Sequence, residues 1–175
     1  MNLALALDKF KNLELKVSKF YRRCSEAADE RKLKDFFEQA ACEEYDHATL
    51  LAEIASKIKN RKLDLIVPVH IVDRLEDFID ELEAGPEGGF DLNWAFEKMV
   101  HIEKSELNSV YESAIHYYTF NAIPRQPMDS LSENLSSHIA RIKQFIEVSS
   151  DLPAIREQAA LLDVKPQNCY KITSE

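Results

Sequence analysis

The scarcity of glycine restricts this chain more than any other feature of its sequence. Only three glycines occur among 175 residues, and all of them fall within residues 85–89, whereas average usage would supply about a dozen. A glycine-rich phosphate loop cannot be built elsewhere in such a chain, which argues against P-loop and Rossmann nucleotide sites. Sandwiches and barrels need frequent turn residues, yet residues 1–67 contain neither glycine nor proline. The sequence therefore predicts long helices.

Charge and cysteine content narrow the class of protein further. The net charge is −9, from 22 basic and 31 acidic residues, which argues against nucleic acid and anionic membranes as partners because both attract clustered Lys and Arg. No apolar run is long enough to span a bilayer, and the first residues lack the basic segment of a signal peptide. Three scattered cysteines form no CxxC pair. We expect a single-domain, cytoplasmic protein with reduced cysteines.

Apolar residues recur at spacings of three and four over most of the chain, as in amphipathic helices. The four long helices that this pattern predicts cover about residues 2–28, 31–59, 91–120 and 129–148. Asp91 is expected to cap the third helix, and Pro124 and Pro127 are expected to end it. Cys24 and Cys42 fall near the apolar stripes and are expected to pack as small hydrophobic residues.

A long connection separates the two helix pairs. It holds a short amphipathic helix over residues 69–82 and ends in the glycines of residues 85–89. A short turn within each pair and a long crossover between the pairs predict an all-α, ferritin-like four-helix bundle made of two antiparallel hairpins. We expect the bundle to occupy residues 1–152, followed by a short helix and a peripheral tail over residues 153–175.

Acidic and imidazole side chains interrupt the apolar stripes of the predicted helices. They are Glu14, Glu44, His47, Glu103, Glu106 and His138. Glu44 and His47 are three residues apart, so they share one helix face. Buried carboxylates cost several kcal/mol each unless they are paired or bind a metal ion. Such groups converging in a bundle predict a metal site, and carboxylates with imidazoles suit iron or manganese, with zinc as a further candidate.

The order of these residues forms a recognisable pattern. Glu14 lies seven residues before Tyr21, Tyr21 lies 23 before Glu44, and the run Glu43-Glu44-Tyr45-Asp46-His47-Ala48 reads EExxHA. In the second half, Glu103-Lys104-Ser105-Glu106 reads ExxE. Over about residues 5–150 the chain resembles the rubrerythrin-type, ferritin-like di-iron proteins. The paired CxxC motifs of a rubredoxin module are missing from the sequence, so we expect no built-in rubredoxin.

The resemblance implies two metal positions with unequal ligand sets. The first would use Glu14, Glu44 and His47, and the second, expected to be weaker, Glu103, Glu106 and His138. The family has a bridging glutamate three residues before the second histidine, where this chain has Leu135. The nearest acid, Glu133, lies about 200° around the helix from Leu135 and should point away. Tyr111 follows Glu103 by eight residues instead of seven, which a single π-bulge would absorb.

The resemblance also implies an activity. It would be redox chemistry at two iron ions, such as peroxide reduction or ferrous iron oxidation, with a small-molecule oxidant, a separate electron donor and a homodimeric state. Two alternatives stay open: a degenerate bundle with one or no metal ion that serves as a structural or interaction module, and a protein that stores metal. Glu103 and Glu106 could also lie on a solvated face, and His138 could be a hydrogen-bonded core histidine. Metal content distinguishes these functions.

Overall fold

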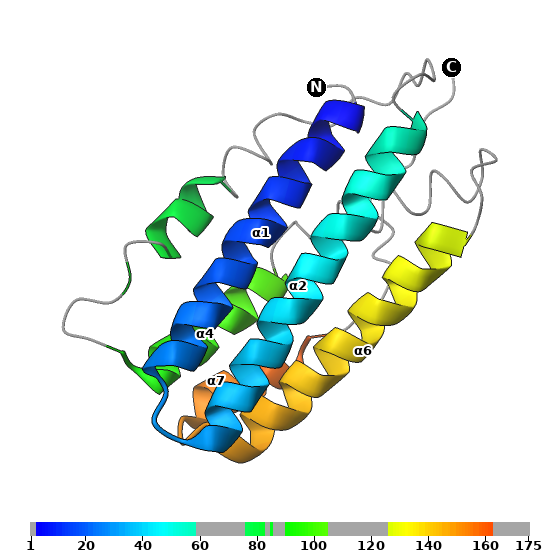
Figure 1. Cartoon of the computed structure of the whole chain (residues 1–175). Helices are drawn as coiled ribbons and strands as arrows, with labels where there is room; N and C mark the ends of the chain where they lie inside the picture. The colour runs from blue at the N-terminus through cyan, green and yellow to red at the C-terminus, as the bar shows by residue number, and fades with distance from the viewer. Residues whose placement is uncertain (1–2, 59–75, 83–84, 86–89, 105–125, 163–175) are drawn as a thin grey trace. The chain divides into compact units, whose positions relative to one another are not determined.

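The structure is a computed structural model of the chain (Figure 1). It describes residues 3–58, 76–82, 85, 90–104 and 126–162. The helices with defined bounds are α1 (Leu3–Ala27), α2 (Arg31–Ile58), α4 (Leu92–Lys104), α6 (Gln126–Ser149) and α7 (Pro153–Ala160). Residues 76–82 are also helical, and no β-strand occurs in these ranges. The predicted all-α class is therefore confirmed.

The chain divides into two compact units, and the division falls inside α4, between Lys98 and Met99. Unit 1 contains α1, α2, the helical residues 76–82 and the first part of α4. Unit 2 contains the end of α4 together with α6 and α7.

In unit 1, α1 and α2 lie side by side as the predicted antiparallel hairpin (Figure 1). The turn between them is short. The helical hydrogen bonds of α1 continue to the N–H of Ala28, which donates to the carbonyl of Cys24 at 3.0 Å. Those of α2 begin at the carbonyl of Glu30, which accepts from the N–H of Lys34 at 3.0 Å. Two buried or half-buried hydroxyl groups join the helices directly. Ser18 donates to the carbonyl of Ala41 at 2.7 Å, and Ser25 donates to the carbonyl of Lys34 at 3.0 Å.

The two described cysteines of this hairpin have different environments. Cys24 is buried, as expected of a small hydrophobic residue, whereas Cys42 is exposed. The expectation for Cys42 is therefore wrong. Cys42 precedes the buried Glu44 by two residues, which is about 200° around a helix, so the two side chains leave α2 on opposite faces.

Aromatic side chains from three helices form much of the core of unit 1. The ring of Phe96 on α4 stacks on Phe37 of α2 at a centroid distance of 6.0 Å and meets Phe36 edge-on at 6.5 Å. Trp94, also on α4, meets Phe20 of α1 edge-on at 5.7 Å. Full burial of each large apolar side chain contributes about 1.5–3 kcal/mol. These contacts anchor the first part of α4 on the hairpin.

Asp91 caps α4, as predicted. Its side-chain Oδ1 accepts a hydrogen bond from the N–H of Asn93 at 2.9 Å, and its carbonyl accepts from the N–H of Ala95 at 2.9 Å. Both bonds begin the helical hydrogen-bonding pattern at the expected residue. The remainder of the predicted third helix, residues 105–120, lies outside the described residues.

The helical residues 76–82, part of the short helix predicted at 69–82, are attached to α1 by polar contacts. Lys9 forms an ion pair with Glu76 at 3.0 Å, and Lys16 forms one with Asp80. The guanidinium of Arg23 donates to the carbonyl of Leu82 at 2.7 Å. This segment therefore follows α1 along the surface of unit 1.

In unit 2, α6 begins earlier than predicted. It starts at Gln126, so that Pro127 lies in its first turn, where we expected this proline to end the preceding helix. Proline is well tolerated there because the first N–H groups of a helix have no partner within the helix. At the other end, α6 packs against α7, and Lys143 donates to the carbonyl of Leu162 at 2.6 Å.

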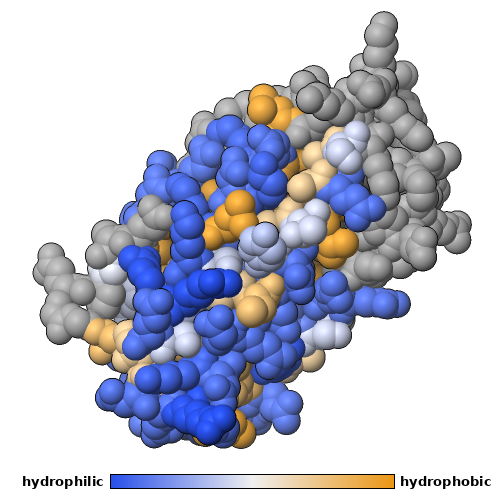
Figure 2. Space-filling model, viewed as in Figure 1, coloured by the Kyte–Doolittle hydropathy of each residue, from blue (hydrophilic) through white to orange (hydrophobic). Residues whose placement is uncertain are grey.

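Hydrophilic side chains predominate over the coloured surface in Figure 2, and hydrophobic ones form small, separate groups. Among the helices in the described ranges, none combines the length and the apolar character needed to cross a membrane.

Candidate metal centre

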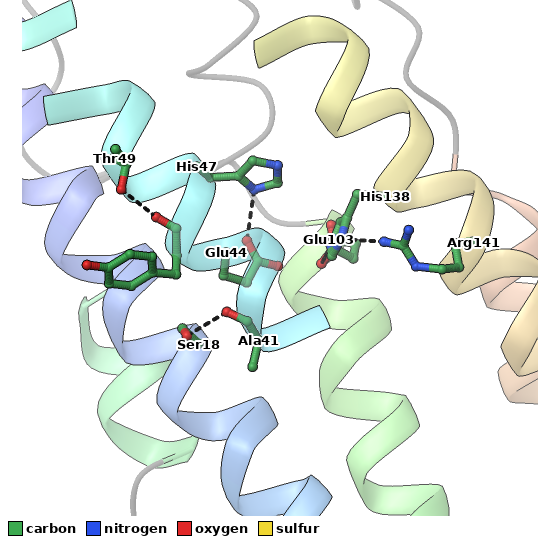
Figure 3. Close-up of polar contacts among 9 residues, drawn as sticks. Ser18, Ala41, Glu44, His47, Thr49, Glu103, His138 and Arg141 are labelled. Atoms are coloured by element: carbon green, nitrogen blue, oxygen red, sulfur yellow. Dashed lines mark hydrogen bonds and ion pairs between the residues drawn. The ribbon is translucent and has the colours of Figure 1, made fainter. Parts of the chain in front are cut away.

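The candidate site in unit 1 consists of Glu14 on α1 and of Glu44 and His47 on α2. Glu14 and Glu44 are each 3 % exposed and His47 is 2 % exposed. One ligand atom from each of the three side chains lies within 4.8 Å of the other two. His47 Nδ1 lies 3.0 Å from Glu44 Oε2 (Figure 3). The structure thus brings together the three residues that the sequence assigned to the first metal position.

The hairpin positions this group through both helix periodicity and register. Glu44 and His47 share a face of α2 because they are three residues apart. Glu14 comes close to both residues only because the register of the two antiparallel helices places it opposite them. The hydrogen bond from Ser18 to Ala41 joins the helices about one turn from the group, since Ser18 follows Glu14 by four residues and Ala41 precedes Glu44 by three.

Buried apolar side chains lie within about one turn of these ligands on the same helices. Phe10, Leu13 and Val17 of α1 are buried, as is Leu51 of α2. Tyr21, two turns after Glu14, is fully buried, and its ring lies 5.3 Å from that of Phe20. Two carboxylates in such surroundings repel each other and lose hydration, so a cation is needed to offset both costs. Two carboxylates and one imidazole are a donor set that fits a divalent iron, manganese or zinc ion.

Unit 2 contains the second group of predicted ligands. Glu103 of α4 is 7 % exposed and His138 of α6 is 1 % exposed. His138 Nε2 lies 3.1 Å from Glu103 Oε1, and Arg141 Nη2 lies 3.4 Å from His138 Nδ1 (Figure 3). Glu103 is therefore buried, and the alternative of a solvated face is wrong for this residue. His138 has polar partners at both ring nitrogens, as a hydrogen-bonded core histidine would have.

Four further residues singled out from the sequence have different outcomes. Glu106 and Tyr111 lie outside the described residues. Leu135 is 4 % exposed and occupies the apolar face of α6, whereas Glu133 is exposed, as its position around the helix predicted.

Arg141 is a residue of this region that the sequence analysis missed. It follows His138 by three residues on α6, and that spacing is the signal that would have identified it. Burial lowers the pKa of its guanidinium from the ordinary value, but an arginine stays protonated in proteins. A positive charge therefore accompanies the Glu103–His138 pair.

Comparison with known proteins supplies independent evidence. A family model described as Rubrerythrin matches residues 7–146 of the chain. No significant match was found among curated proteins or among solved structures. The match includes both groups of candidate ligands and most of the chain, and the structure of the described residues is all-helical. The chain therefore belongs to the rubrerythrin family and has the ferritin-like four-helix bundle fold of that family.

Proposed function

We propose that this protein binds non-haem iron and uses it in redox chemistry, such as peroxide reduction or ferrous iron oxidation. The observation that carries the proposal is the buried group of Glu14, Glu44 and His47, whose ligand atoms lie within 4.8 Å of one another. Membership of the rubrerythrin family supports the assignment. Iron, when bound, would supply the electron transfers.

The side chains of unit 1 would hold the ion in complementary ways. The carboxylates of Glu14 and Glu44 carry two negative charges, which match a divalent ion. The Nδ1 atom of His47 points toward Glu44 Oε2 at 3.0 Å, so the imidazole and the carboxylate can face a common ion. The buried apolar neighbours Phe10, Val17 and Leu51 would keep bulk water from the ligands and strengthen their attraction for the ion.

A second position would use Glu103, Glu106 and His138. The order of these residues and the family support it, whereas Leu135 removes one carboxylate that the family uses there. Binding of one ion therefore depends on unit 1, and turnover at two ions depends on whether this second group also takes an ion.

The partners belong to the same proposal. The substrate would be a small-molecule oxidant such as peroxide, and the electron donor would be a separate molecule. We further propose a cytoplasmic homodimer without nucleic-acid or membrane partners.

Elemental analysis tests the proposal most directly. Metal-free protein is loaded anaerobically with Fe²⁺, desalted and measured for iron, and the loaded sample is then supplied with hydrogen peroxide. We expect bound iron and peroxide consumption in the unmodified protein and neither in Glu44→Ala. Glu38→Ala, an exposed acid on the same helix, is the matched control and should behave like the unmodified protein. Absence of bound iron in all three samples would favour a structural module.

A further inference from the structure

We propose that the Arg141 guanidinium is the resident cation of the Glu103–His138 pair and excludes a metal ion from it. The chain would then hold one tightly bound ion, at Glu14, Glu44 and His47, instead of two. The inference rests on the proposed function, because it concerns the stoichiometry of the same metal protein.

Hydrogen-bond chemistry determines which nitrogen of His138 carries the proton. A guanidinium has only donors, so Arg141 Nη2, at 3.4 Å, must donate to His138 Nδ1. An imidazole that accepts at Nδ1 carries its hydrogen on Nε2, which then donates to Glu103 Oε1 at 3.1 Å. Both ring nitrogens of His138 therefore have hydrogen-bond partners without a metal ion.

This arrangement opposes metal binding at either nitrogen. A metal ion needs the imidazole lone pair, and in this tautomer the lone pair lies on Nδ1, toward the guanidinium. Binding through Nε2 would move the hydrogen to Nδ1, where it would face Arg141. Metal-bound histidines instead direct their other N–H at a carboxylate, a carbonyl or water, and arginine offers no acceptor. Arg141 would have to leave before His138 could become a ligand.

Charge leads to the same conclusion. Glu103 is a buried carboxylate, and a buried carboxylate requires a cation or several hydrogen bonds. Arg141 supplies a positive charge through His138, from the same face of α6. Leu135, one turn before His138, is buried and apolar, so that position contributes no carboxylate to attract a second cation. A divalent ion placed here would face a fixed positive charge in a medium of low dielectric constant.

The imidazole of unit 1 has a partner of opposite charge at Nδ1. The Nδ1 atom of His47 faces the Glu44 carboxylate at 3.0 Å, whereas Nδ1 of His138 faces a guanidinium. Two histidines that occupy corresponding places in the sequence pattern thus differ in the group at Nδ1, which is a carboxylate for His47 and a guanidinium for His138.

Metal titration of the metal-free protein tests the proposal. Anaerobic Fe²⁺, and Mn²⁺ in a parallel series, are titrated by calorimetry, and tightly bound metal is measured after desalting. We expect one ion per chain for the unmodified protein and for Arg141→Lys, which keeps the charge. We expect two for Leu135→Glu/Arg141→Met, which removes the cation and restores a carboxylate. Leu135→Glu/Arg141→Gln provides a polar substitute should the methionine variant fail to fold.

Leu135→Glu/Arg156→Met is the matched control. It carries the same new carboxylate but replaces an exposed arginine of α7, and it should still bind one ion. Two ions in the unmodified protein would overturn the inference and leave the proposed function standing. One ion in both Arg141 double variants would overturn the role of Arg141. No ion in any sample would overturn both proposals.

Nitrogen-15 NMR of the metal-free protein gives a readout that is independent of loading. The imidazole of His138 should have its hydrogen on Nε2 in the unmodified protein. In Arg141→Met, the hydrogen of His138 should no longer be confined to Nε2. A hydrogen on Nδ1 in the unmodified protein would contradict the proposal.

Discussion

The hydroxyl of Ser18 on α1 donates a 2.7 Å hydrogen bond to the carbonyl of Ala41 on α2, and both residues lie about one turn from the candidate ligands of their helices. Ser18 is buried, so this bond is a fixed point between the two helices close to the candidate ligands. It sets how far along α1 the carboxylate of Glu14 lies opposite Glu44 and His47.

Replacing Ser18 with alanine should therefore weaken metal binding as well as stability. Loss of one intramolecular hydrogen bond is expected to cost about 1 kcal/mol in the free energy of unfolding, measured by urea denaturation. A shift of α1 along α2 would move Glu14 away from Glu44 and His47. We expect iron affinity to fall by about tenfold or more, as it does when residues that support metal ligands are replaced. Ser56→Ala removes an exposed hydroxyl that donates to the carbonyl of Glu53 within α2, and it should change neither quantity. Equal iron affinity in the two variants would refute the role of Ser18 in alignment.

Glu14→Gln should move metal affinity and metal-free stability in opposite directions. The amide keeps the shape of the side chain but removes one of two buried like charges, so the metal-free protein should be equally stable or more stable by about 1 kcal/mol. Iron affinity should fall about 100-fold or more. Calorimetric titration and thermal denaturation measure the two effects, with the exposed Glu38→Gln as control. A large loss of metal-free stability would instead indicate that the Glu14 carboxylate is structural.

Removal of metal should lower the melting temperature of the unmodified protein. A ligand present at about 100 times its dissociation constant stabilises the folded state by about 2.7 kcal/mol, and a chelator should abolish that increment. The increment should shrink as the pH falls, because protons compete with the ion for carboxylates and imidazole. Differential scanning calorimetry with and without Fe²⁺ measures it. An increment of the same size in His47→Ala would show that the ion binds elsewhere.

The two described cysteines should differ in reactivity. Burial raises the pKa of Cys24 to about 12 from its model-compound value of 9.0, whereas Cys42 is exposed. Iodoacetamide at about pH 8 should modify Cys42 in the native protein and Cys24 only after denaturation. Peptide mass spectrometry separates the residues, and rapid labelling of native Cys24 would contradict its burial.

The raised pKa of Cys24 also has a consequence for stability at alkaline pH. Between about pH 9 and 12 the unfolded chain loses the thiol proton while the folded chain retains it. The free energy of unfolding should therefore decline with rising pH in this window, by at most about 1.4 kcal/mol per pH unit from this group. The decline should be shallower in Cys24→Ala, and parallel curves for the two proteins would contradict the assignment.

Local sequence patterns predicted the hairpin and two of the three residues of its metal group. The three-residue spacing of Glu44 and His47 is enough to put both on one face of α2. The meeting of Glu14 with them depends on the register of two helices, which periodicity alone does not determine and which the Ser18–Ala41 bond helps to set. Family resemblance, rather than periodicity, supplied that part of the prediction.

The differences between the predicted and the observed structure have identifiable physical causes. The sequence pattern predicts a helix end at Pro127, although proline is equally suited to the first turn of the next helix, where the structure has it. Cys42 was grouped with an apolar stripe although it leaves α2 on the face opposite to Glu44. The role of Arg141 could not be predicted from the sequence pattern because arginine is ordinarily a surface residue, and that role depends on the contact between its guanidinium and His138 Nδ1.

The ligands of unit 1 all come from one hairpin, and this affects when they can meet during folding. Contacts between segments close in sequence form faster than contacts between distant ones. Glu14, Glu44 and His47 require only α1, α2 and the short turn between them. During synthesis on the ribosome, this hairpin emerges before α4, α6 and α7. A metal ion bound there would stabilise the hairpin while the later helices are still being made.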